Sequence, residues 1–466
     1  MTDALDPSLE AALVAAAGRA NVLVEESARR GAARDGLRVA RAALGDLQGP
    51  VVPLAVVRPD DTAGVVRVVR ALHGAGLPLV TLGGGTGLMG GARVVRPAIV
   101  LDLGRMSRVL AVNAADRVAR VQAGTVFAAL NSALAPQALF CGHDPWTVPI
   151  ATVGGAISTN GLGYLAGRYG SIGDQVLGLT VVLPNGAVVE TRATERTSTG
   201  PHLRRLWVGA EGTLGVITEV TLRVFPLPER RMLHALSFPH FRAGFAAVCA
   251  LAALGLRPTT VDFGGPPRGG PALMYLAFDG LAEEVEALST RALAICLEHG
   301  GSTRGEAVAQ EFWEDRHVEP SRLQSWRRGE AEEPEPGTPG SVVVEYLHIY
   351  LPQSRVLEFL TRATAEFARA GADVSEWGLW HQPELISLVV RRTTDTRTEL
   401  QALREAHDAA LRLAQDLGGS MEYVHGVGLR LAHLIAREHG TGLSVLRAIK
   451  AVLDPEGLLN PGKLGF

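Results

Sequence analysis

The sequence predicts an α+β protein of two or three domains, and three observations lead to this expectation. The chain has 466 residues, of which 47% are hydrophobic, and this is enough for sizeable cores. Strand, helix and strand patterns follow one another in the first part of the chain and end in a glycine-dense loop. From residue 228 onward, strand–helix pairs recur, as expected for helices packed on an antiparallel sheet.

The first part of the chain begins with helical sequence. Residues 8–45 are rich in Ala, Glu, Arg and Leu, and they predict one or two helices. Leu54–Val57 predicts a strand, and the stretch Pro59–Thr62 then supplies an N-cap for a helix that runs up to Gly74 and Gly76. Further strands are expected near residues 77–82, 98–103, 109–113, 118–123, 177–183 and 186–191, and a helix is expected over residues 126–134.

The second part of the chain contains two strand–helix pairs of similar design. A strand over 273–278 precedes a helix over 281–299, and a strand over 342–350 precedes a helix over 353–370. The remaining expected elements are a strand over 385–390, a solvated loop over the Glu-, Pro- and Gly-rich stretch 327–340, and two helices with a tail over 397–466.

Composition excludes several classes of protein. A formal net charge of −3 gives no sign of a nucleic-acid partner, which usually requires a basic face. Cys141, Cys249 and Cys296 lie far apart and predict reduced thiols rather than disulfides or a zinc site. We expect neither a signal peptide nor a membrane-spanning helix, and therefore a cytoplasmic protein, with peripheral association at a membrane left open.

A glycine-dense loop, Gly83–Gly91, follows the strand expected over 77–82. Glycine lets the backbone approach a ligand closely, and successive free N–H groups form an anion site, so the loop predicts a bound diphosphate. The loop also matches the G-x-G-x-x-G pattern of nicotinamide sites, but that pattern must open a helix. Here Val94, Val95 and Pro97 are poor helix formers and precede a strand, so we reject the nicotinamide interpretation.

Four stretches of the chain follow one another in a characteristic order. They are Gly83–Gly91; Asp144-Pro145 with Ala151–Gly161, Tyr169-Gly170 and Asp174; Gly209–Glu219; and Leu453–Lys463. In this order the chain resembles the flavin oxidoreductases of the vanillyl-alcohol oxidase and p-cresol methylhydroxylase fold. Within that group it is most similar to the branch of glycolate oxidase subunits, D-lactate dehydrogenases and alkylglycerone-phosphate synthases.

The resemblance implies a two-lobed FAD-binding domain and a cap. The expected domains are an N-terminal helical segment (1–46), the FAD-binding domain (47–227), a substrate cap with a ferredoxin-like antiparallel sheet (228–425) and a C-terminal segment that completes the FAD site (426–466). The residues that the resemblance places at FAD are Gly83, Gly84, Gly85, Thr86, Gly87, Leu88, Asp144, Pro145, Thr152, Gly154, Gly155, Ser158, Thr159, Gly161, Tyr169, Gly170, Glu211, Val216, Ile217, Asn460 and Lys463.

The way in which FAD is held depends on Thr86. Family members that attach FAD covalently through this loop carry a histidine at the corresponding place, and this chain does not. We therefore expect FAD to be bound without a covalent link.

Oxidation of a 2-hydroxy acid needs a base, a group that binds the carboxylate and a dry cavity. His425 resembles the histidine–glycine motif that relatives place over the flavin, and it is the expected base; a buried histidine bonded to backbone is the alternative. Tyr346 and His348 share one face of the expected strand 342–350. We expect this face to line the substrate cavity; a face turned to solvent is the alternative. Arg316 is the expected carboxylate anchor, because arginine binds carboxylates bidentately; a surface ion pair is the alternative.

No metal is expected, because the paired-histidine stretch that binds a divalent metal in many relatives is missing. The corresponding residues, 376–387, offer only His381 and Glu384 as ligands. Together with Glu422 and His425, these two side chains are the remaining candidates for a metal site.

The expected function is FAD-dependent oxidation of a small 2-hydroxy acid or alcohol by hydride transfer to flavin N5. The alternatives are an alkylglycerone-phosphate synthase-like transferase, a phenolic alcohol oxidase and an electron-transfer flavoprotein subunit. The electron acceptor is open among a quinone, a cytochrome, an electron-transfer protein and O2, and a homodimer is an open expectation.

Overall fold

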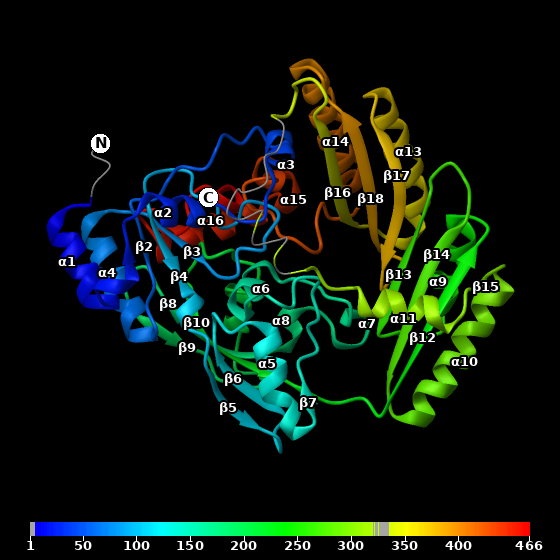
Figure 1. Ribbon diagram of the computed structural model, residues 1–466, viewed down its shortest axis with the longest axis horizontal. Coiled ribbons are helices and arrows are strands. Elements are labelled where there is room, and N and C mark those ends of the chain that lie inside the picture. Colours follow the sequence, from blue (N-terminus) through cyan, green and yellow to red (C-terminus); the bar gives the residue numbers. More distant parts are fainter. Residues whose placement is uncertain (1–4, 320, 322–324, 326–334) are drawn as a thin grey trace.

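The computed structural model of the protein describes residues 5–319, 321, 325 and 335–466 (Figure 1). It confirms the α+β class, with two N-terminal lobes on one side and a cap on the other. Most of the loop expected over 327–340 lies outside the described residues.

The first lobe is built on a mostly parallel sheet in the order β1-β2-β4-β3. Its strands are β1 (Val22–Leu23), β2 (Ala55–Val57), β3 (Leu79–Leu82) and β4 (Ile99–Asp102). Helix α4 (Thr62–Ala75) starts where the sequence predicts, because the Asp61 side chain accepts the Gly64 N–H at 2.6 Å. The helix ends at Gly76, which adopts a left-handed conformation.

The second lobe is an antiparallel sheet in the order β5-β6-β10-β8-β9. Its strands are β5 (Val109–Asn113), β6 (Val118–Gln122), β8 (Val176–Val182), β9 (Val188–Glu190) and β10 (Val216–Arg223). The hairpin predicted around Asn185 is confirmed by the pairing of β8 with β9. Two short strands, β7 (Leu139–Phe140) and β11 (Phe225–Pro226), pair next to this lobe.

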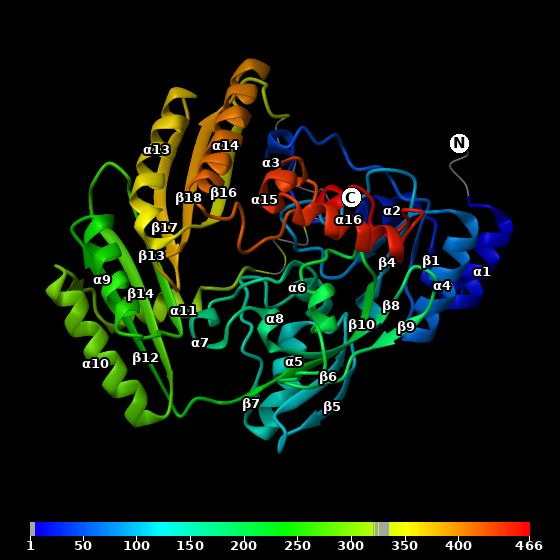
Figure 2. The ribbon, with the colours of Figure 1, turned by 180° about the vertical axis from the view of Figure 1, so that it is seen from behind.

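The cap contains the largest sheet, in the order β15-β12-β14-β13-β17-β18-β16. Its strands are β12 (Arg230–Phe238), β13 (Thr260–Gly265), β14 (Ala272–Gly280), β15 (Ser302–Thr303), β16 (Val342–Tyr350), β17 (Asp373–Trp380) and β18 (Leu385–Thr393). Helices cover the face of this sheet that points away from the lobes (Figures 1 and 2). They are α9 (Phe241–Ala253), α10 (Ala282–Glu298), α13 (Val356–Arg369) and α14 (Arg397–Asp416).

The other helices connect and close the domains. They are α1 (Pro7–Ala17), α2 (Glu26–Ala32), α3 (Val39–Leu44), α5 (Phe127–Leu134), α6 (Val153–Thr159), α7 (Ala166–Tyr169), α8 (Ile172–Gln175), α11 (Glu306–Glu314), α15 (Ile435–His439) and α16 (Gly442–Leu453). After α16 the tail returns to the first lobe, where Leu79 donates to Leu458 and Asn460 donates back to Leu79, each at 2.8 Å. The predicted return of the C-terminus to the FAD-binding domain is therefore confirmed.

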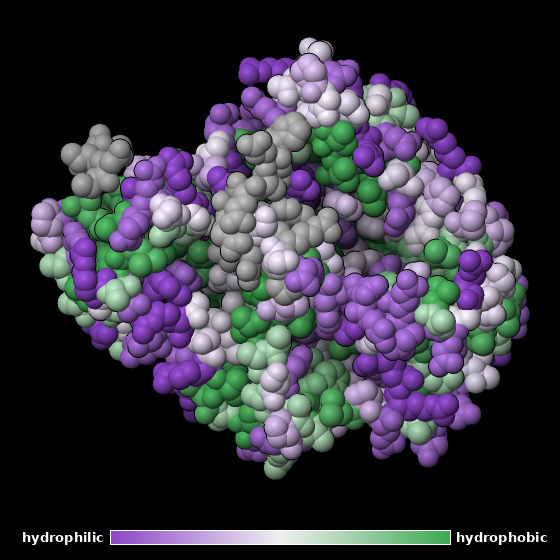
Figure 3. Space-filling view, in the orientation of Figure 1, coloured by the Kyte–Doolittle hydropathy of each residue, from purple (hydrophilic) through white to green (hydrophobic). Residues whose placement is uncertain are grey.

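The N-terminal segment is part of the first lobe. Strand β1 pairs with β2, and α1 packs on α4. The expected domain boundaries at 46/47, 227/228 and 425/426 remain predictions. None of the helices in the described part of the chain has the length and apolar composition needed to cross a membrane. On the face drawn in Figure 3, hydrophilic side chains predominate over α11, and a hydrophobic area lies over the edge strand β16, where Val342 is exposed.

Candidate active site

An open pocket lies between the two lobes and the cap, and about 1490 Å³ of empty space, open solvent included, lies within it. One wall is the glycine loop after β3, which continues into β4 without a helix. The other walls are the segment 143–162, the start of β10 and three cap residues, Trp380, Val424 and His425.

The two glycine-rich segments contact each other so closely that side chains do not fit between them. A Cβ atom at Gly84 would lie 2.5 Å from the carbonyl oxygen of Ile150, and one at Gly83 would lie 2.5 Å from Thr152 Oγ1. The Gly84 N–H also donates to Thr152 Oγ1 at 3.2 Å. The segments therefore form a close-packed backbone wall of the kind that holds a diphosphate, which fits the predicted cofactor.

Most of the residues that the sequence places at FAD line this pocket. They are Gly83, Gly84, Gly85, Thr86, Gly87, Leu88, Pro145, Thr152, Gly154, Gly155, Ser158, Thr159, Gly161, Glu211, Val216 and Ile217. The others do not line it: Asp144, Tyr169, Gly170, Asn460 and Lys463.

Asn460 and Lys463 hold the tail against the glycine loop. Asn460 Nδ2 donates to the carbonyl oxygen of Gly91 at 2.8 Å and to that of Glu211. Lys463 Nζ donates to the carbonyl oxygen of Arg93 at 2.6 Å. Both side chains are buried, and burial lowers the pKa of Lys463 to about 8. In this structure they support the pocket wall from behind.

Asp144 and Arg316 are partners of each other. Arg316 Nε donates to Asp144 at 2.8 Å, His317 Nε2 contacts the other carboxylate oxygen at 2.8 Å, and the guanidinium lies 4.0 Å from the centre of the Trp313 ring. Arg316 therefore connects the region after α11 to the FAD-binding domain and does not line the pocket. Tyr169 packs against Phe225, with ring centroids 4.5 Å apart, and Gly170 turns the chain beside it at a φ of 73°.

Glu211 joins the FAD-binding domain to the segment that carries His425. Its carboxylate accepts the N–H groups of Val427 at 2.7 Å and of Gly428 at 2.9 Å. Burial raises the pKa of Glu211 to about 7, although these two hydrogen bonds act in the opposite direction. The position of Glu211 fixes the turn that follows His425.

Asp35 and His143 are ionisable pocket residues that lie outside the family motifs. Asp35, from the N-terminal segment, accepts the N–H of Ala92 at 3.2 Å, and burial raises its pKa. His143 packs edge-on to Phe127, with ring centroids 4.9 Å apart, and burial lowers its pKa to about 4. Neither residue shows a pattern in the sequence that marks it; only the fold brings them to the pocket.

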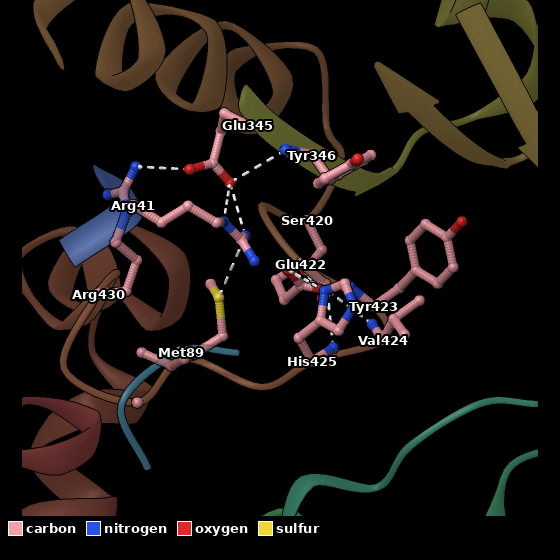
Figure 4. Close-up of polar contacts among 12 residues, drawn as sticks. Arg41, Met89, Glu345, Tyr346, Ser420, Glu422, Tyr423, Val424, His425 and Arg430 are labelled. Carbon is pink, nitrogen blue, oxygen red and sulfur yellow. Dashed lines mark hydrogen bonds and ion pairs between the residues drawn. The ribbon is translucent and has the colours of Figure 1, made fainter. Parts of the chain in front are cut away.

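His425 enters the pocket from the cap side, and Glu422 holds the short loop that carries it (Figure 4). Glu422 Oε1 accepts the N–H groups of Tyr423, Val424 and His425 at 3.0, 2.7 and 2.9 Å. Its other oxygen lies 3.6 Å from His425 Nδ1. The imidazole is therefore fixed by its own loop and oriented by a carboxylate, an arrangement that suits a base.

Tyr346 and His348 share one face of β16, but they lie in two different environments. His348 is buried, and its ring centroid lies 4.6 Å from that of His425. Burial lowers the pKa of His348 to about 3, and this keeps the ring neutral at physiological pH. Tyr346 is 45% exposed, and neither it nor His348 lines the pocket.

Both halves of the chain match models of known protein families. The model of the FAD binding domain matches residues 53–192, and that of the C-terminal domain of FAD linked oxidases matches residues 260–464.

Curated relatives align over most of the chain. Glycolate oxidase subunit GlcD of Bacillus subtilis (strain 168) is 28% identical and covers 89% of each chain. D-2-hydroxyglutarate dehydrogenase of Xanthomonas citri pv. viticola is 30% identical and covers 88% of this chain and 89% of its own. The solved structure of p-cresol methylhydroxylase with substrate bound superposes with a TM-score of 0.77 at 17% identity, over 98% of this chain and 96% of its own, and it therefore shares the fold.

The two matched domains and the pocket between them define a flavin-dependent oxidoreductase. The chain belongs to the FAD-linked oxidase family, and its cofactor is FAD, as the sequence predicts. The resemblance to the p-cresol methylhydroxylase fold is confirmed as well.

Proposed function

We propose that the protein oxidises the hydroxyl group of a small 2-hydroxy acid of the glycolate or D-lactate kind. The position of His425 carries the proposal, because it is the titratable side chain among the three cap residues that line the FAD pocket. His425 takes the proton of the substrate hydroxyl. When bound, FAD would supply the acceptor for the hydride from the carbon atom that bears this hydroxyl group.

Glu422 positions the base. Its contact with His425 Nδ1 at 3.6 Å favours the tautomer with a proton on Nδ1, so that Nε2 is the basic atom. Trp380 and Val424 provide apolar surface beside the base and limit the access of water. The choice of a 2-hydroxy acid is supported by the relatives, which are named after glycolate and D-2-hydroxyglutarate.

The test is anaerobic mixing of the FAD-loaded protein with glycolate, D-lactate, L-lactate, D-2-hydroxyglutarate and simple alcohols, followed by the loss of flavin absorbance. We expect at least one 2-hydroxy acid to reduce the flavin, and His425→Asn to slow that reduction by about 100-fold or more. Exposed His202 offers a matched control, because His202→Asn removes a histidine outside the pocket. Equal rates in the two variants would remove His425 as the base.

Failure of every 2-hydroxy acid to reduce the flavin would contradict the proposal. Reduction by alcohols alone would point to the alcohol oxidase, and a product formed from an acyl-glycerone phosphate without net reduction would point to the transferase. For a reactive substrate, quinones, cytochromes, electron-transfer proteins and O2 are then compared as acceptors in steady-state turnover.

A further inference from the structure

Two carboxyl groups of the cap sheet have no cationic partner. Asp262 lies on β13 and Glu376 on the adjacent strand β17. Within the described part of the chain, no hydrogen bond or ion pair joins either carboxyl group to another residue. Burial, and after it the charge of Glu376, raises the pKa of Asp262 to about 7. Carboxyl groups taken out of water are normally paired, and these two lack a counter-charge.

Both carboxyl groups lie on the face of the cap sheet that points toward the FAD-binding lobes. Phe263 packs on Phe241 of α9, with ring centroids 4.8 Å apart, on the helix-covered face (Figures 1 and 2). Because side chains alternate along a strand, Asp262 points to the opposite face. Gly264 shares that face, and a Cβ atom there would lie 2.5 Å from Glu376 Oε1. Glu376 therefore extends over β13 next to Asp262.

Trp380 connects Asp262 to the FAD pocket. The two residues are cross-strand partners in β13 and β17, and Trp380 lines the pocket. The Tyr164 ring lies 5.7 Å from the Trp380 ring, centroid to centroid, and Thr260 Oγ1 of β13 donates to the Tyr164 carbonyl oxygen. Burial, and after it the charge of Asp262, raises the pKa of Tyr164. The carboxyl group of Asp262 therefore lies near two aromatic rings at the cap end of the pocket.

Two further polar groups beside Trp380 are buried and unpaired. His348 is 9% exposed, its ring centroid lies 6.0 Å from that of Trp380, and its Nδ1 has no hydrogen-bond partner in the described part of the chain. The ring of Tyr423 lies 5.8 Å from that of His348, and its buried hydroxyl group is unpaired among the same residues. Burial and the charges of Glu422 and Asp262 raise the pKa of this tyrosine. Unpaired polar atoms from three elements thus surround one place, and a bound ligand would satisfy them.

We propose that Asp262, Trp380 and Tyr164 form a subsite for an ammonium group at the far end of the substrate, so that the protein prefers 2-hydroxy acids with a cationic side chain. An ammonium group donates hydrogen bonds to a carboxylate, and it is attracted to the faces of tryptophan and tyrosine rings. Glu376 adds a second negative charge to the subsite, so a side chain that ends in a carboxylate is repelled. The preference in oxidation rests on the function proposed above, whereas the binding of the ammonium group does not.

Positive side chains of the cap leave this subsite unfilled. Arg316, whose charge reaches Tyr164, binds Asp144 at 2.8 Å. Arg391 follows the cross-strand neighbour of Glu376 by two positions in β18, and no ion pair joins it to Glu376 in the described part of the chain. At the end of β17, His381 Nε2 contacts the carbonyl oxygen of Gly163 at 3.0 Å. The charge of the two carboxyl groups is therefore available to a ligand.

The binding experiment uses the FAD-loaded protein and ligands without a hydroxyl group, so that the flavin is not reduced. 4-Aminobutanoate, pentanoate and glutarate have the same chain length and differ in the far group, which is an ammonium, a methyl or a carboxylate group. Their dissociation constants are measured by calorimetry at about pH 8, above the pKa of Asp262. We expect 4-aminobutanoate to bind at least about tenfold more tightly than pentanoate, and glutarate to bind more weakly than pentanoate.

Asp262→Asn keeps the size of the side chain and removes its charge, so the preference for 4-aminobutanoate over pentanoate should disappear. Asp373→Asn is the matched control, because Asp373 is an exposed carboxylate of the same strand as Glu376 and pairs with Arg268 at 3.6 Å; it should keep the preference. The thermal midpoint and the flavin-to-protein ratio check folding, and Glu376→Gln replaces Asp262→Asn if that variant loses flavin. A wild type without the preference, or an unchanged preference in the folded variant, would overturn the proposal.

The turnover experiment compares 4-amino-2-hydroxybutanoate, 2-hydroxypentanoate and 2-hydroxyglutarate, each as both enantiomers, as reductants of the flavin. We expect kcat/KM to be at least about tenfold higher for the amino compound, and Asp262→Asn to lower it for that substrate alone, chiefly through KM. Equal values for the three acids, or the highest value for 2-hydroxyglutarate, would contradict the preference. If none of them reduces the flavin, the proposed function fails, but the calorimetric comparison still decides whether the ammonium subsite exists.

Discussion

Arg41 of α3 and Glu345 of β16 form a buried ion pair, with Arg41 Nη2 2.6 Å from Glu345 Oε1. The two residues are 304 positions apart in the chain, and the pair joins the N-terminal segment to the cap. Arg430 approaches the other oxygen at 3.6 Å, so that two guanidinium groups share one carboxylate (Figure 4). His425, the base proposed above, lies in the neighbouring loop (Figure 4).

Replacing Glu345 should destabilise the protein strongly. Glu345→Gln leaves two buried guanidinium groups without a counter-charge, and breaking a buried pair in this way costs about 3–5 kcal/mol. The measurement is the denaturation midpoint in urea, followed by both fluorescence and circular dichroism. The control is Glu366→Gln, which breaks the exposed pair with Arg369 and should change the midpoint little. Similar shifts in the two variants would show that the buried pair contributes no more than a surface pair.

The Glu345 carboxylate also predicts that the stability of the folded protein falls at acid pH. Burial alone would raise the pKa of Glu345, but Arg41 and Arg430 outweigh it and hold the pKa at about 2, below the ordinary value of 4.5. A lowered folded-state pKa stabilises the protein above pH 4.5, and this contribution is lost as pH falls toward 2. The difference in unfolding free energy between wild type and Glu345→Gln should therefore shrink over this interval. A constant difference from pH 5 to pH 2.5 would contradict the assignment.

The local patterns of the sequence predict the FAD-binding lobes better than the cap. Helix α4 shows its cap and its apolar face, and the β8–β9 hairpin shows its turn, because these signals lie within a few residues of one another. Strand β12 starts with exposed Arg230 and Arg231 and lacks clear alternation. Strand β13 ends in two glycines. Such strands are defined by their neighbours in the sheet, which the sequence does not place.

The candidate site, too, has a part that local sequence patterns predict and a part that depends on tertiary contacts. The glycine loops can be recognised in the sequence, because a backbone segment that approaches a ligand closely favours glycine over residues with side chains. His348 and His425 are neighbours because β16 lies against the loop after α14. This is a tertiary contact between distant segments, and the sequence patterns do not predict it. Arg316 shows a different limit, since its residue type suits an anchor, but in the structure its guanidinium binds Asp144.

Gly84 should be intolerant of a side chain. An alanine Cβ would meet the Ile150 carbonyl oxygen at 2.5 Å and force the two glycine segments apart. Overpacking of this kind costs about 1–3 kcal/mol, so FAD should bind Gly84→Ala about tenfold to 100-fold more weakly. The measurement is the FAD dissociation constant of the deflavinated protein. Gly49→Ala, where nothing lies within 4 Å of the added atom, should bind FAD normally.

Thr86 predicts that acid releases the flavin. The residue lines the pocket in the glycine loop, and its side chain offers no imidazole nitrogen for a covalent link to the flavin. Precipitation of the holoprotein with acid should therefore leave the yellow colour in the supernatant, and mass spectrometry of the pellet should give the mass of the unmodified chain. Colour retained in the pellet would show a covalent link from another residue.

Arg316 provides a test between a substrate anchor and a connection within the protein. Burial alone would raise the pKa of Asp144, but the contacts with His317 and Arg316 lower it, so the carboxylate stays charged and holds the guanidinium. Arg316→Ala should therefore lower the thermal midpoint, since it leaves a buried carboxylate with only one partner.

Two substrates distinguish an anchor from a connection within the protein: a reactive 2-hydroxy acid, and the alcohol of the same size without the carboxylate. Loss of an anchor would reduce kcat/KM for the acid alone, because only the acid carries the group that an anchor binds. Loss of the connection with Asp144 loosens the cap over the pocket and should reduce kcat/KM for both substrates by the same factor. We expect the second outcome, and a selective loss for the acid would restore Arg316 as the anchor.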